Sequence, residues 1–157
     1  MAVELDMSQL AVFEKKLRGM TQRKIQEGFS GTHHSGLTNA SLAYMLEEGR
    51  RGDINEPPIP ARPAFKDSLF KLKVEGIFQR RAQELYTEYL QGTITQEAFF
   101  QSLGSIMVSG HKKTMRNWYL VGSEAKHNAP ITIKNKGFDQ PFVEDGELVS
   151  SVHYEVV

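Results

Sequence analysis

A connector rich in glycine and proline divides the chain between Gly49 and Pro63. Two glycines and four prolines stand in this range, together with several charged side chains. Proline fixes its own φ angle and restricts the residue before it, so the run from Pro57 to Pro60 predicts a stiff, extended segment. The connector therefore separates the regular elements that precede it from those that follow it.

Helices and one strand are expected before the connector. Apolar residues spaced three and four apart predict a helix over residues 8–19 and another over residues 38–49. Residues 21–29 form a short strand candidate. Three glycines, two serines and two histidines in residues 28–36 predict a flexible loop.

Longer helices are expected after the connector. An apolar stripe predicts one helix over residues 63–91, beginning at a proline that suits a first helical turn and weakened at Gly76. Thr93 with Gln96 is a capping-box pattern that opens a second helix. Gly110 is expected to kink this helix before it resumes.

Two strands are expected near the end of the chain. Residues 131–136 contain a β-branched run, and residues 150–156 place Val152, Tyr154 and Val156 on one face. Helix outweighs strand, so the predicted class is α+β. We expect a single domain over residues 1–157, with a small, mostly antiparallel sheet packed against two long helices and shorter N-terminal helices.

Composition narrows the class of protein. The 157 residues include 19 basic and 19 acidic side chains and no cysteine. A net charge of zero argues against a generic nucleic-acid binder, and the absence of cysteine excludes disulfides and thiolate metal sites. No apolar run approaches the roughly 20 residues of a membrane span, and the acidic N-terminus does not resemble a signal peptide. We therefore expect no contact with a membrane.

No catalytic signature is found. The sequence lacks a nucleophile elbow, a phosphate-binding loop, a zincin pair and a dinucleotide fingerprint. Gly-Ser pairs occur without the strand–turn–helix frame that a catalytic serine requires. We therefore expect neither an enzyme nor a cofactor.

Two separate groups of side chains, one of histidines and one of carboxylates, are candidate metal ligands. His33 and His34 are adjacent, but neighbours on an extended chain point in different directions and no spaced third ligand follows. Glu144, Asp145 and Glu147 are acidic, but the surrounding loop lacks the alternating oxygen ligands of a calcium site. The sequence thus favours a solvated loop for the histidines, a turn for the carboxylates, and no metal site.

Four residues are expected to form turns. Gly49 closes the helix over residues 38–49, and Gly137 interrupts the chain after the β-branched run. Gly146 supplies a tight turn in which Asp145 accepts hydrogen bonds from the backbone.

Basic side chains gather in two places. Lys112, Lys113 and Arg116 form one cluster, and Lys134 with Lys136 forms the other. Such clusters either contact DNA or belong to solvated faces, and acidic residues elsewhere balance their charge. Both interpretations stay open at this point.

Three segments in order carry a resemblance to a known family. They are Leu37-Thr38-Asn39-Ala40-Ser41-Leu42-Ala43 with Glu48-Gly49; Ile59-Pro60-Ala61-Arg62-Pro63 with Phe65; and a C-terminal block beginning Asn128-Ala129-Pro130, continuing through Thr132-Ile133 and Lys136-Gly137, and ending in Gly146-Glu147-Leu148 and a serine-rich strand. In this order they resemble the tailed-bacteriophage tail-completion family, also called neck or head–tail joining proteins.

The resemblance implies a structural virion protein that assembles in the host cytoplasm. Subunits of this kind form a ring at the head–tail junction, with six copies favoured and twelve possible. The implied partners are other neck, connector and tail proteins. DNA would pass through the channel without sequence-specific binding. The alternatives are a tail terminator or another tail or baseplate protein and, from a different class, a nucleic-acid-binding module.

The connector and the C-terminal strands are the expected contacts between subunits. Arg62, held between two prolines, would clamp a carboxylate of a neighbouring subunit or, alternatively, bind within its own subunit. The candidate interface residues are Pro60, Arg62, Pro63, Phe65, Ile131, Ile133, Val152 and Tyr154.

Overall fold

The computed structural model describes residues 7–54, 58–121 and 127–157. The fold is α+β, as predicted. Among these residues, β1 (Ile25–Phe29) and β2 (Val152–Val156) form a two-stranded antiparallel sheet that joins the two halves of the chain. Ile25 pairs with Val156 and Phe29 with Val152. Both strands are shorter than expected, because the neighbouring helices extend into residues 21 and 150.

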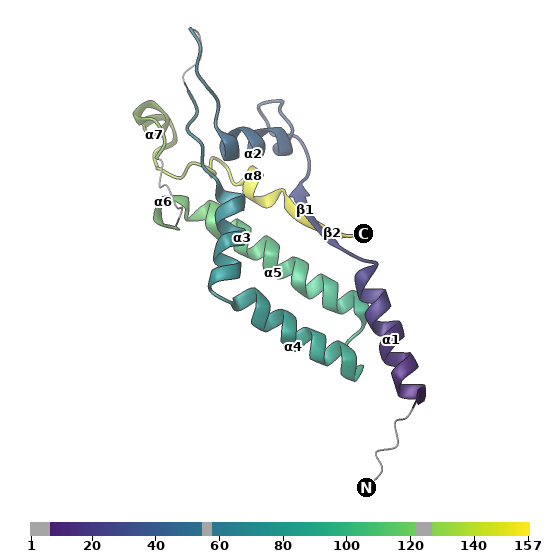
Figure 1. The fold of residues 1–157 in the computed structure, drawn as a ribbon. Helices are drawn as coiled ribbons and strands as arrows, with labels where there is room; N and C mark the ends of the chain where they lie inside the picture. The colour runs from purple at the N-terminus through teal and green to yellow at the C-terminus, as the bar shows by residue number, and fades with distance from the viewer. Residues whose placement is uncertain (1–6, 55–57, 122–126) are drawn as a thin grey trace.

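A single long helix, α5 (Gln96–Arg116), runs through the middle of the body and contacts both strands (Figure 1). The Thr95 hydroxyl caps it by accepting a hydrogen bond from the backbone N–H of Ala98 at 3.1 Å. α5 continues without interruption through Gly110, where a kink was predicted. Gly110 instead faces Leu72, whose Cδ1 would lie 3.1 Å from an added Cβ, so the glycine permits close packing between helices.

The helix predicted over residues 63–91 is two helices. α3 (Ala64–Val74) and α4 (Ile77–Gln91) meet at Gly76, which has a left-handed conformation with φ 65°. A helix of L-residues continues only through right-handed angles, so the chain changes direction there. Both α3 and α4 lie along α5 (Figure 1).

The strand predicted over residues 131–136 is a helix, α7 (Pro130–Lys136). Pro130 occupies the first turn, where its missing N–H is tolerated, and Gly137 ends the helix with φ 80°. These terminal signals outweigh the strand preference of Ile131 and Ile133, which depends on a partner strand. Neither isoleucine therefore lies at a sheet edge.

The remaining helices of the described residues are α1 (Met7–Thr21), α2 (Asn39–Glu48), α6 (Trp118–Val121) and α8 (Glu147–Ser150). The connector projects away from the body between α2 and α3, with Arg50 and Ile59 bridged at its base by two 2.9 Å backbone hydrogen bonds (Figure 1). Within the described part of the chain, no helix is long and apolar enough to cross a membrane.

The buried side chains form two clusters along α5. One cluster surrounds Trp118, whose indole meets the ring of Phe142 edge to face at 5.7 Å. The other contains Leu85 and Tyr89 of α4 with Phe99 of α5. The first cluster brings the C-terminal segment against α2, and this contact creates the site described next.

Candidate functional site

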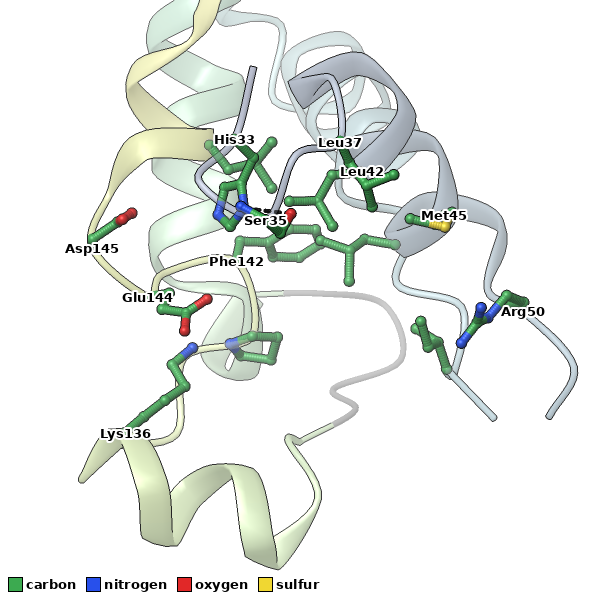
Figure 2. A pocket seen from close by; sticks show the side chains of 14 residues that line it. His33, Ser35, Leu37, Leu42, Met45, Arg50, Lys136, Phe142, Glu144 and Asp145 are labelled. Carbon is green, nitrogen blue, oxygen red and sulfur yellow. Dashed lines mark hydrogen bonds between the residues drawn. The ribbon is translucent and has the colours of Figure 1, made fainter. Parts of the chain in front are cut away.

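A pocket with a volume of about 590 Å³, which we call the α2 pocket, lies between α2, the loop before it and the segment that leads into α8 (Figure 2). Apolar side chains line much of it: Leu37, Leu42, Met45, Leu46, Phe142 and Leu148. The loop is held by a bridge between Thr32 and Thr38 and by the Asn39 amide, which donates to the carbonyl of Ser30 at 2.8 Å. Thr38 also caps α2 by accepting from the backbone N–H of Ser41.

Charged side chains lie at the rim of this pocket. Lys136 and Glu144 point toward one another in Figure 2. Burial lowers the pKa of the Lys136 ammonium, and the negative charge of Glu144 opposes this shift. The Lys136 ammonium also donates to the carbonyl of Gln140 at 3.0 Å, which ties α7 to the pocket wall.

Two histidines and two carboxylates gather beside the pocket. His33, His34, Asp145 and Glu147 each offer one ligand atom, and these atoms all lie within 4.8 Å of one another. His34 Nδ1 lies 3.2 Å from Asp145 Oδ2 and 3.3 Å from Glu147 Oε2. His33 Nε2 lies 4.0 Å from the same Glu147 oxygen. We call these four residues the His–carboxylate cluster.

The local fold of the loop explains how adjacent histidines meet. The backbone N–H of Gly36 donates to the carbonyl of His33 at 2.8 Å, and this turn brings the two imidazole rings to 3.9 Å between centroids. Adjacent histidines point in different directions only on an extended chain, as the sequence analysis assumed. A further candidate ligand does exist: Glu147, which lies 113 positions later in the sequence, contacts His34.

The turn before α8 prepares Asp145 to act as an anion. Its Oδ1 accepts a hydrogen bond from the backbone N–H of Glu147 at 2.8 Å. This bond lowers the pKa of the Asp145 carboxyl, and the nearby histidines lower it further. Gly146, between them, has φ 88°, which suits the turn expected here. Oδ2 of Asp145 points toward His34.

A second pocket of about 240 Å³ lies between β1, α2 and α5. Glu27 and His111 line it and form a buried pair, with Oε1 3.3 Å from Nδ1. The His111 ring also meets the rings of Phe29 and Phe65 edge to face, at 5.5 and 5.0 Å. Phe65, an expected interface residue, is thus packed within its own chain.

Arg62 lies inside the subunit. It is buried, and its guanidinium donates to the carbonyl of His127 at 2.9 Å while its backbone N–H donates to the carbonyl of Leu46. Burial lowers the pKa of Arg62, which the charge of Asp139 opposes. Of the two expected roles, contact within the same subunit fits this position, and a clamp on a neighbouring subunit does not.

The other expected interface residues differ in exposure. Val152 is buried in the core, and Tyr154 packs its ring against Gly104, so neither offers a free apolar surface. Pro60 and Ile131 are exposed, whereas Pro63 and Ile133 are partly covered. The expected turn glycines Gly49 and Gly137 have φ 75° and φ 80°, at the ends of α2 and α7.

The basic clusters lie on two helices. Lys113 and Arg116 are exposed on the last turn of α5, and Lys134 is exposed on α7. Lys112 donates to the carbonyl of Ser150 at 3.3 Å. The structure therefore leaves three of the five cations directed to solvent.

Comparison of the chain with protein-family models, with curated proteins and with solved structures finds no match.

Proposed function

We propose that this chain is a structural subunit of a tailed-phage virion that forms a ring at the head–tail junction. The ring would contain six copies, or twelve, around the channel through which DNA passes. The proposal starts from the resemblance of the three sequence segments to the tail-completion family. Two surface features of the subunit support it, and the apolar face of α3 carries most weight.

The face of α3 and the start of α4 exposes large apolar side chains. Phe70 is 65% exposed and Val74 64% exposed, with Leu69 and Ile77 beside them in sequence at 38% and 42%. Phe70 and Val74 are four residues apart on one helix, so they share a face. Contiguous exposed apolar side chains are typical of protein–protein contacts. A neighbouring subunit would cover this surface, which we call the α3 face.

The connector is the second supporting feature. It projects beyond the body (Figure 1), and Ile54 in this connector is fully exposed. A projecting segment with an apolar side chain suits a contact with the next copy in a ring. The two-stranded sheet also leaves main-chain groups at its outer edges for pairing with a strand of a neighbour.

The cations Lys113, Arg116 and Lys134 are proposed to face the DNA channel. A channel that lets DNA pass needs positive charge without base-specific contacts. Replacing all three by glutamine should therefore reduce genome delivery while leaving ring formation intact. Loss of the ring in this variant would place the three residues at a subunit interface instead.

The ring is tested by the solution mass of the purified chain and by negative-stain images. We expect particles of six or twelve times 17.8 kDa with a central hole. Phe70→Ser with Val74→Ser should release subunits, because these changes remove apolar contact area. Leu120→Ser, which removes a similarly exposed side chain outside the α3 face, is the matched control. A monomer at every concentration contradicts the ring.

The position in the virion needs a separate test. A phage deleted for this protein should accumulate filled heads and separate tails if the ring joins them. Tails of abnormal length would instead support a tail terminator. Normal virions from the deletion would contradict both.

A further inference from the structure

We propose that the His–carboxylate cluster binds one divalent transition-metal ion, with zinc as the best match. The site is independent of the virion assignment. It consists of His33 and His34 from the loop before α2 and of Asp145 and Glu147 from the turn that begins α8.

The distances between ligand atoms fit one bound ion. Zinc binds imidazole nitrogen and carboxylate oxygen at about 2.0–2.2 Å, so neighbouring ligands of a tetrahedral site lie about 3.3 Å apart. His34 Nδ1 lies 3.2 Å from Asp145 Oδ2 and 3.3 Å from Glu147 Oε2. His33 Nε2 and Glu147 Oε2, at 4.0 Å, are too far apart for a hydrogen bond and need only a small closure around an ion.

His33 is the strongest indication that a ligand belongs here. Its side chain is only 8% exposed, and its Nε2 lies 4.0 Å from the Glu147 oxygen. Its Nδ1 lies 2.9 Å from the hydroxyl of Ser35. Nδ1 also accepts a hydrogen bond from the backbone N–H of Ser35 at 3.2 Å. Binding of a metal by Nε2 would move the imidazole proton to Nδ1, where the Ser35 hydroxyl can accept it. Outer hydrogen bonds of this kind commonly orient metal-binding histidines.

Both carboxylates are already held in place by hydrogen bonds from the backbone. Asp145 accepts a backbone hydrogen bond through Oδ1, which leaves Oδ2 directed at His34. Glu147 Oε2 accepts from the backbone N–H of His34 at 3.2 Å, which fixes its carboxylate against the loop. Ordering of the ligands before binding reduces the entropy that binding must overcome.

The set of ligands selects the class of ion. Two imidazoles and two carboxylates suit zinc, nickel, cobalt or copper, whereas calcium and magnesium prefer sites made of oxygen alone. Four ligands from the protein complete a tetrahedral shell, which is typical of structural zinc rather than catalytic zinc.

The ion would link two segments that are far apart in sequence. The loop with His33 and Ser35 and the segment with Asp145 both line the α2 pocket, and they lie side by side in Figure 2. An ion bound by both would hold these two segments together. Binding should therefore raise the melting temperature, because only the folded chain assembles all four ligands.

The test is calorimetric titration of the metal-free protein with zinc chloride. We expect one zinc ion per chain, an increased melting temperature, and no comparable binding of magnesium chloride. His34→Ala and Glu147→Gln should each weaken zinc binding at least tenfold. Both side chains are partly or largely exposed, so the variants should keep the fold, which far-ultraviolet circular dichroism checks.

The matched control is His153→Gln. His153 is a partly exposed histidine near a single carboxylate, with Nε2 3.8 Å from Glu155 Oε1, and it lies outside the cluster. This variant should bind zinc as the unmodified chain does. Nitrogen chemical shifts of the imidazoles should change at His33 Nε2 and His34 Nδ1 and stay constant at His153.

Three outcomes would overturn the site. One is no measurable zinc binding by the unmodified chain. Another is weak binding of several ions with equal affinity in all variants, which is the behaviour of scattered surface histidines. The third is a zinc-dependent shift at His153 in place of His33 and His34. Cobalt substitution gives an independent check, because intense visible absorption bands are expected only for a tetrahedral ion.

Discussion

Glu27 and His111 form a side-chain contact in the interior, where β1 meets α5. The carboxylate Oε1 lies 3.3 Å from the imidazole Nδ1, and both side chains are only 2% exposed. Oε2 of Glu27 has no hydrogen-bond partner among the described residues. The imidazole is therefore the group that compensates the burial of this carboxylate.

Removal of the imidazole should destabilise the fold strongly. His111→Ala leaves the Glu27 carboxylate buried without its partner, a change that typically costs about 3–5 kcal/mol. Chemical denaturation of the variant measures this loss. Glu27→Ala combined with His111→Ala should cost less than the sum of the single changes. Arg23→Ala, which breaks the exposed 2.7 Å pair with Glu97, is the control and should cost under about 1 kcal/mol.

Gly104 on α5 is expected to tolerate no side chain. A Cβ there would lie 2.2 Å from Cδ2 of Tyr154, whose hydroxyl donates to the carbonyl of Gln101 at 3.0 Å. Gly104→Ala should therefore displace the tyrosine and lower the unfolding free energy by about 1–3 kcal/mol. Thermal and denaturant unfolding measure the effect. Gly28→Ala, whose Cβ would lie 4.0 Å from His153, should be nearly neutral, and equal effects of the two would contradict the packing argument.

Alanine substitutions at Gly49 and Gly137 distinguish the cost of backbone strain from the cost of a steric clash. Both have positive φ, so alanine at either position should cost about 1–2 kcal/mol through strain. A Cβ at Gly49 would also lie 2.7 Å from the backbone nitrogen of Ala61, whereas nothing lies within 4 Å at Gly137. Gly49→Ala should therefore destabilise the protein more than Gly137→Ala. The opposite order in paired unfolding experiments would show that the connector moves freely.

Asp139 should make stability depend on pH in the acid range. Its Oδ1 accepts from the backbone N–H of Asn128 at 2.8 Å, which lowers the carboxyl pKa below its usual 3.8, and the His127 side chain lowers it further. A group with a lowered folded pKa stabilises the fold above its unfolded pKa. That stabilisation is lost as the pH falls through the folded value.

A carboxyl titration followed by NMR checks this expectation. The Asp139 midpoint should lie below 3.8, and Asp139→Asn should remove its part of the acid dependence of unfolding. A midpoint at or above the usual value would mean that the Asn128 hydrogen bond does not persist in solution.

Local signals in the sequence were reliable where neighbours in the chain decide the outcome. The second long helix was expected, but its cap is Thr95 and not Thr93 of the predicted capping box. The weak point predicted at Gly76 is where α3 and α4 separate. Residues 131–136 were misassigned, because β-branched residues favour a strand only where another strand can pair with them. Pro130 and Gly137 instead favour the short helix.

By itself, the sequence determined the α+β class, the approximate bounds of α1 and α2, and the glycine turns, because caps, glycines and apolar spacing act over a few residues. Only the tertiary structure decided which distant side chains meet. His34 reaches Glu147 across 113 positions, and Glu27 reaches His111 across 84. Such contacts depend on how α5 gathers both ends of the chain around it. Local spacing therefore argued against a metal site, whereas the folded chain brings four suitable ligands together.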